Sequence, residues 1–272
     1  MYLSILLLPE TLHAQELKSS EKTQQRDQLW EAFVVTANKG LSADAVKLGE
    51  ELLAFEKSQP GLESEKLIQT IEYLAAIYEQ DVAWEKALAK RQEALDLRIK
   101  LHGEGDWKAT NARLLLASSK RRSTFSSEER AAFDSINLLK EKVETFSREG
   151  NRPAAIAAAN SVVSKWKDLF GESHPEYALA LNRLANLHFG SKDYATAEPL
   201  YQKAIENGRK VLGENHPELA TRFNNLANLH FDSKDYANAE SPLCANMRET
   251  TLSFFKVEGT ESFHDRVNRQ KS

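Results

Sequence analysis

The chain has 272 residues, of which 28% are charged, and its formal net charge is −4. That length allows one elongated repeat array or one to two compact domains. The acidic balance argues against general binding of a nucleic-acid backbone, which needs clustered positive charge. A single cysteine, Cys244, excludes both an intrachain disulfide framework and a cysteine-based zinc cluster.

The N-terminal residues 1–18 suggest either a signal peptide or a disordered start. Met1 to Leu8 is almost entirely apolar, and a proline follows at once. This pattern is typical of a secretory signal core, but the run is short and has no positively charged residues before it. A frayed first helix is the alternative, so the localisation stays open between the cytoplasm and export. No other segment approaches the ~20 apolar residues of a membrane span.

A 42-residue repeat organises the rest of the chain, and it is clearest near the C-terminal end. Residues 171–198 and 213–240 are identical at 20 of 28 positions without a gap, and 213 minus 171 is 42. Both segments begin with Gly-Glu-x-His-Pro-Glu and share the string Leu-Ala-Asn-Leu-His-Phe. Chance does not produce such identity, so a repeat architecture is expected.

The same period extends more faintly towards the N-terminus. The array is expected over residues 19–254, in units 19–60, 61–102, an irregular 103–128, 129–170, 171–212 and 213–254. Residues 255–272 are expected to form a polar tail. After Glu240 the identity to the preceding unit falls to 0 of 14 positions. This leaves two explanations open: an atypical capping end of the array, or a coding sequence that is truncated or shifted in frame.

Each unit has the pattern of two amphipathic helices. In the unit that starts at Gly171, two sets of residues recur at helical spacing: Leu181, Leu184, Ala185 and His188, and then Ala197, Leu200, Tyr201, Ala204 and Ile205. Asp193 can cap the second helix, and Gly171 suits a left-handed C-terminal cap. Pro175 fits the first turn of a helix. Ala197 and Ala204 let neighbouring helices approach closely, so the predicted fold class is an all-α solenoid of stacked antiparallel helix pairs.

These residues resemble the tetratricopeptide repeat family. Leu184 and Ala185 occupy the large and small signature positions of the first helix, and Ala197, Tyr201 and Ala204 occupy those of the second. The 42-residue unit with its Gly-Glu-x-His-Pro linker looks like the kinesin-light-chain type. The resemblance is strong over 171–240, moderate over 61–102, and weak over 19–60 and 103–170, where Lys142 replaces an expected apolar residue. It implies a repeat scaffold, not a motor subunit.

The candidate chemical groups favour a non-catalytic protein. His174, His188, His216 and His230 recur with the repeat, and no carboxylate or thiol joins them at the usual zinc spacing, so packing and capping are favoured over a metal site. Cys244 has no periodic histidine partner for nucleophilic catalysis. There is no glycine-rich phosphate loop or hydrolase motif in the sequence. We therefore expect no enzyme activity, no cofactor and no metal.

The run Lys120-Arg121-Arg122 is the one dense basic stretch in the middle of the chain. Serines flank it and two glutamates follow, so it is interpreted as part of a solvated linker. A small basic patch is the alternative interpretation.

The asparagines on the predicted first helices are the candidate binding residues. Arrays of the resembling family bind extended peptides in the groove that their first helices line. The residues that flank the Leu-Ala pair on the groove face are Asn182, Arg183, Asn186, Asn224, Asn225 and Asn228. An amide offers a donor and an acceptor and can hold a peptide backbone without selecting its sequence. The alternative is that these are ordinary exposed polar positions.

The sequence thus predicts a scaffold whose partner is a protein or an extended peptide, with no nucleic acid and no membrane span. One alternative is a truncated fragment without a ligand, which self-associates through the unit 213–254. Another is a regulatory part of a larger signalling system, which rests only on analogy between folds.

Overall fold

A computed structural model of the chain describes residues 8–59 and 65–233. Those residues form ten helices and no strand. The helices are α1 (Leu8–Asn38), α2 (Ser42–Lys57), α3 (Glu65–Gln80), α4 (Trp84–His102), α5 (Trp107–Ser123), α6 (Ser127–Arg148), α7 (Arg152–Phe170), α8 (Pro175–Gly190), α9 (Tyr194–Leu212) and α10 (Pro217–Asp232). The predicted all-α class is confirmed.

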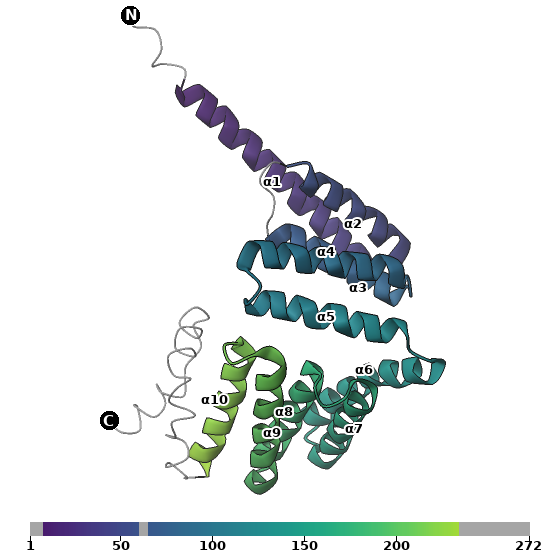
Figure 1. The fold of residues 1–272 in the computed structure, drawn as a ribbon, viewed down its shortest axis with the longest axis vertical. Coiled ribbons are helices and arrows are strands. Elements are labelled where there is room, and N and C mark those ends of the chain that lie inside the picture. Colours follow the sequence, from purple (N-terminus) through teal and green to yellow (C-terminus); the bar gives the residue numbers. More distant parts are fainter. Residues whose placement is uncertain (1–7, 60–64, 234–272) are drawn as a thin grey trace, which may run out of the picture. The chain divides into compact units, whose positions relative to one another are not determined.

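The chain divides into two compact units, Met1–Ser123 and Thr124–Ser272. In the first unit each helix from α1 to α5 packs against the next, and in the second unit each helix from α6 to α10 does the same (Figure 1). Consecutive helices therefore form the stacked pairs that the repeat predicts. None of the described helices is long and apolar enough to cross a membrane.

Small residues hold the helices of the second unit together. Ala185, Ala197 and Ala204 are each 0% exposed, which confirms their predicted place between packed helices. Around them lie larger apolar side chains, among them Tyr201 and Leu184. Because alanine adds only a methyl group, the helix backbones can approach closely there.

The turn chemistry of the repeat is confirmed in part. The Asp193 side chain accepts a hydrogen bond from the Thr196 backbone N–H and so caps α9, as predicted. Pro175 begins α8. Gly171 has a positive φ of 81°, but its ψ of 173° is extended, so the predicted left-handed helical cap is wrong. That backbone region is accessible essentially to glycine alone, which explains the residue differently.

The turn inside each helix pair uses a left-handed residue at an equivalent place. Gly40 and Gly150 take it with φ of 72° and 74°, but Val82 takes it with φ of 60°. A left-handed conformation costs an L-residue roughly 1–2 kcal/mol, and a β-branched side chain makes it a genuine outlier. The Val82 side chain is 48% exposed, so packing offsets little of this strain.

Val82→Gly is therefore expected to stabilise the chain by about 0.5–1 kcal/mol, after the extra backbone entropy of glycine in the unfolded state is subtracted. The control is Val35→Gly, at a valine of similar exposure inside α1, which should instead cost a few tenths of a kcal/mol through helix propensity. Urea unfolding of the full chain measures both changes. A loss of stability in Val82→Gly would contradict the strain argument.

The interpretation of Lys120-Arg121-Arg122 as a linker is wrong. The three residues form the last turn of α5, where cations complement the helix dipole. The Arg122 side chain also forms an ion pair with Glu79 of α3 at 2.7 Å. Most of the unit 103–128, which the repeat pattern leaves as irregular, is thus helix α5 of the first unit.

Several predictions fall at the edges of the described part. Helix α1 covers residues 8–18, where the sequence indicates an export segment or a disordered start, and cleavage there stays a prediction. Cys244, the second half of the unit 213–254 and the tail 255–272 lie outside the described residues.

Candidate peptide-binding groove

The six predicted site residues lie on two neighbouring first helices of the second unit. Asn182, Arg183 and Asn186 come from α8, and Asn224, Asn225 and Asn228 come from α10. Arg183 and Asn186 are exposed, and the three asparagines of α10 are half-buried. Asn182 differs from the rest, since it is only 6% exposed.

The expectation that Asn182 is exposed in the groove is therefore wrong. Its Oδ1 accepts a hydrogen bond from the Asn225 Nδ2 of the next repeat, at 3.2 Å. This bond satisfies the buried Asn182 Oδ1 and one N–H of Asn225, and it links α8 to α10. Alanine at either position would leave a polar group without its partner, so it tests stability before it tests recognition.

Asn186 has the geometry of a binding residue. Its Oδ1 accepts a hydrogen bond from the Tyr201 hydroxyl at 2.5 Å. Burial raises the pKa of Tyr201, so the hydroxyl stays protonated and acts as the donor. This bond fixes the amide orientation and leaves the two N–H groups of Asn186 to donate outward.

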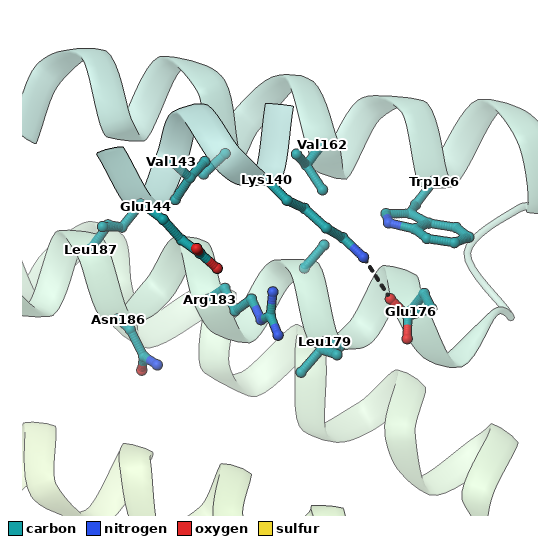
Figure 2. A pocket seen from close by; sticks show the side chains of 12 residues that line it. Lys140, Val143, Glu144, Val162, Trp166, Glu176, Leu179, Arg183, Asn186 and Leu187 are labelled. Atoms are coloured by element: carbon teal, nitrogen blue, oxygen red, sulfur yellow. Dashed lines mark hydrogen bonds and ion pairs between the residues drawn. The ribbon is translucent and has the colours of Figure 1, made fainter. Parts of the chain in front are cut away.

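A pocket of about 250 Å³ opens beside Asn186, between α6, α7 and α8. Figure 2 shows its lining, with side chains of α6 and α8 facing each other and Trp166 of α7 at one end. Most of the lining is apolar, and polar groups stand at the rim. The lining residues are Lys140, Val143, Glu144, Ala159, Val162, Trp166, Glu176, Leu179, Ala180, Arg183, Asn186 and Leu187.

The charges at the rim are mixed. Lys140 Nζ lies 3.3 Å from Glu176 Oε2 and 5.3 Å from the centre of the Trp166 ring, so it is held by an ion pair and a cation–π contact. Arg183 and Glu144 are exposed, and neither has an ion pair within the described part of the chain. The rim can therefore bind both polar main-chain groups and charged side chains, while the floor favours apolar ones.

Sequence reasoning found two of the pocket residues, Arg183 and Asn186, and missed the others. The 42-residue period is sufficient to predict two of the missed residues. Lys140 and Glu144 lie 42 residues before Asn182 and Asn186, so one more step of the repeat places them on the same face of the preceding first helix. The contribution of α7, Trp166 above all, could not be found from first-helix positions.

The histidines act as structural residues in the described part. The Nδ1 atoms of His174 and His216 accept hydrogen bonds from the backbone N–H of Glu176 and Glu218, which caps α8 and α10. His188 Nδ1 lies 2.9 Å from Asp193 Oδ2. Within residues 8–59 and 65–233, no three side chains of metal-ligating type gather into a site.

Comparison with known proteins identifies the repeat. The family model for the tetratricopeptide repeat matches residues 134–207 and 177–244. No curated protein matches the chain. Among solved structures, BtubC from P. vanneervenii is similar at 16% identity and a TM-score of 0.38, over 93% of this chain and 89% of that one.

Two further structures show a similar degree of likeness. A putative kinesin light chain of Podosopora anserina, with nearly identical TPR-like repeats, has 15% identity and a TM-score of 0.36, over 86% of this chain and 97% of that one. The TPR2AB domain of yeast Sti1, in its pHSP90 complex, has 14% identity and a TM-score of 0.31, over 86% and 85%. With TM-scores below 0.5, these three similarities support no statement about the function of the chain. The family match covers residues 134–244, so this part of the chain consists of tetratricopeptide repeats.

Proposed function

We propose that the chain is a non-catalytic scaffold that binds an extended peptide segment of another protein in the groove beside α6 and α8. Tetratricopeptide repeats generally mediate interactions between proteins. The observation that carries the proposal is the apolar pocket beside Asn186, whose amide N–H groups are free to donate.

The arrangement suits a peptide more than a folded surface patch or a small molecule. An extended peptide presents carbonyl oxygens between its side chains, and Asn186 supplies donors for one of them. Arg183 lies one turn away and adds a charged donor at the same rim. Apolar side chains of the peptide would have the pocket floor to contact.

The test is selection of peptides from a random twelve-residue library on the immobilised full chain, followed by affinity measurements in solution. The double variant Arg183→Ala, Asn186→Ala should weaken the selected peptides by tenfold or more, because each lost hydrogen bond is worth about 0.5–1.5 kcal/mol and those to charged groups more. Its thermal unfolding is measured in parallel, because Asn186→Ala also removes the acceptor of the buried Tyr201 hydroxyl and should cost about 1–3 kcal/mol of stability. The affinity is therefore measured at a temperature at which both chains are fully folded.

The matched control is Arg152→Ala, Asn160→Ala, which removes the same two residue types from exposed positions of α7 outside the pocket lining. It should bind the peptides like the parent chain. Failure to select any peptide would contradict the proposed function and favour a fragment without its own ligand. Equal weakening in both double variants would mean that the recognition surface lies elsewhere.

A further inference from the structure

We infer that the groove seats a single large apolar side chain of its peptide in the pocket between α6, α7 and α8, and not in the equivalent space one repeat later. This inference rests on the proposed function, and it adds which repeat of the groove receives the apolar side chain of the peptide. It follows from comparing the pocket lining with the residues 42 positions further along the chain.

The pocket is open because its lining combines one large residue with two small ones. Trp166 forms one end, and Ala159 and Ala180 leave the space beside it empty. At the equivalent positions one repeat later, the large and small residues are exchanged. Tyr201 corresponds to Ala159, Gly208 to Trp166 and Arg222 to Ala180.

Arg222 fills the second space. Its side chain is 2% exposed, and its Nη2 lies 2.7 Å from Glu218 Oε2 on the same helix. A Cβ atom at Gly208 would collide with the Arg222 guanidinium and would lie 2.8 Å from Leu219 Cδ2. Glycine is therefore needed at 208 because arginine occupies the space that the tryptophan side chain takes one repeat earlier.

Two further contacts close the same space. Tyr201 is 1% exposed, where Ala159 leaves room in the preceding repeat. The hydrogen bond between Asn182 and Asn225 spans α8 and α10, and these residues correspond to Lys140 and Arg183 at the open pocket. An incoming side chain would have to displace packed groups of the protein itself.

The size and charge of the open pocket define its occupant. A volume of about 250 Å³ lies below the roughly 300–1,000 Å³ of sites that enclose a whole small molecule, so it suits one side chain. The floor is apolar, and the only charge pair at that end, Lys140 with Glu176, is internally neutral. A leucine or phenylalanine side chain fits this chemistry, with its neighbouring carbonyl oxygen accepting from Asn186.

Trp166 reports on occupancy directly. It is the only tryptophan in the second unit, while Trp30, Trp84 and Trp107 lie in the first. The probe is N-acetyl-phenylalanine amide, titrated into the isotope-labelled full chain while the four indole N–H resonances are followed. The Trp166 signal should shift and saturate, and the other three should stay in place.

Ala180→Leu fills the pocket from within and should abolish that shift. It should also weaken the library-selected peptides at least tenfold, and those peptides should share one large apolar position. The matched control is Ala195→Leu, at an exposed alanine in the first turn of α9, which should behave like the parent chain. If Ala180→Leu does not fold, Leu179→Ala takes its place and should weaken the peptides several-fold.

The outcomes separate the inference from the proposed function. Selected peptides that bind Ala180→Leu as tightly as the parent chain would overturn the anchor pocket and leave peptide binding intact. A library that yields no binder overturns both. A parent chain that sediments as a dimer, and becomes a monomer on Ala180→Leu, would mean that a second copy occupies the pocket and would overturn the peptide as its occupant.

Discussion

Replacing Glu79 by alanine should destabilise the first unit by about 3–5 kcal/mol, the loss typical of breaking a buried ion pair. The Glu79 side chain is 5% exposed. Its Oε1 accepts hydrogen bonds from Arg91 Nε at 2.9 Å and Ser119 Oγ at 2.6 Å, and its Oε2 accepts one from Arg122 Nη1 at 2.7 Å. Without the carboxylate, the guanidinium groups of Arg91 and Arg122 would lose the negative charge that they share.

The pKa of Glu79 depends on its burial and on these hydrogen bonds and ion pairs. Burial raises the pKa, but the hydrogen bonds and positive charges of Arg91 and Arg122 lower it by more, so the net shift is downward. The carboxylate is therefore ionised at neutral pH and joins α3 to both α4 and α5. Loss of this one group should loosen two helix contacts at once.

Glu65 on the same helix provides the control. It forms ion pairs with Arg98 and Lys108 and lies 2.6 Å from His102 Nε2, but its side chain is 49% exposed. Each exposed ion pair is worth about 0–1 kcal/mol, so Glu65→Ala, which removes the pairs with Arg98 and Lys108, should cost no more than about 2 kcal/mol. Urea unfolding followed by circular dichroism measures both variants. Similar losses in the two would show that burial does not decide the strength of the Glu79 site.

The same contact explains why the sequence misleads around residues 118–127. Three consecutive cations between serines have the composition of a solvated linker. The partner that makes Arg122 structural is Glu79, 43 residues earlier, and no local pattern points to it. By contrast, positions fixed by helix packing, such as Ala197 and Ala204, follow directly from the repeat, because each repeat must bury the same small contact.

The candidate site shows where periodicity stops being sufficient. The repeat predicts that Asn182 and Asn186 share one helix face with their counterparts in α10, but Asn182 is buried and Asn186 is exposed. It does not show that Asn225 bonds to Asn182, because this bond joins positions 43 and not 42 residues apart. It also does not show that Arg222 fills, one repeat later, the space that is open beside Ala180, since that depends on Trp166 and Gly208 of the second helices.

Acidification from pH 7 to pH 5 should destabilise the second unit by roughly 2 kcal/mol through His216 alone. His216 is 3% exposed and is the N-cap residue of α10, where its Nδ1 accepts a hydrogen bond from the Glu218 backbone N–H at 3.2 Å. That bond requires an unprotonated Nδ1. Burial, together with the positive charge of Arg222, lowers the pKa of His216 from 6.5 to about 4.

The sign follows from proton linkage. In the unfolded chain the imidazole takes up a proton near pH 6.5, whereas in the folded chain it resists one until about pH 4. The contribution to stability is therefore complete above pH 6.5 and is lost as the pH falls towards 4. Each pH unit within this window is worth about 1.4 kcal/mol, less near its upper end, which gives the roughly 2 kcal/mol between pH 7 and 5.

His216→Asn isolates the effect, because asparagine is a strong N-cap whose side chain also accepts from the backbone but does not titrate. Carboxylates whose pKa is lowered, such as Glu172 and Asp193, lose their contribution only below their ordinary range near pH 4 and so act outside this window. Urea unfolding at pH 7, 6 and 5 should show a smaller decline in His216→Asn than in the parent chain, by roughly 2 kcal/mol in total. Parallel declines in both chains would mean that the buried imidazole is not the acid-sensitive group, and that its place at the start of α10 has no bearing on the pH stability of the repeat.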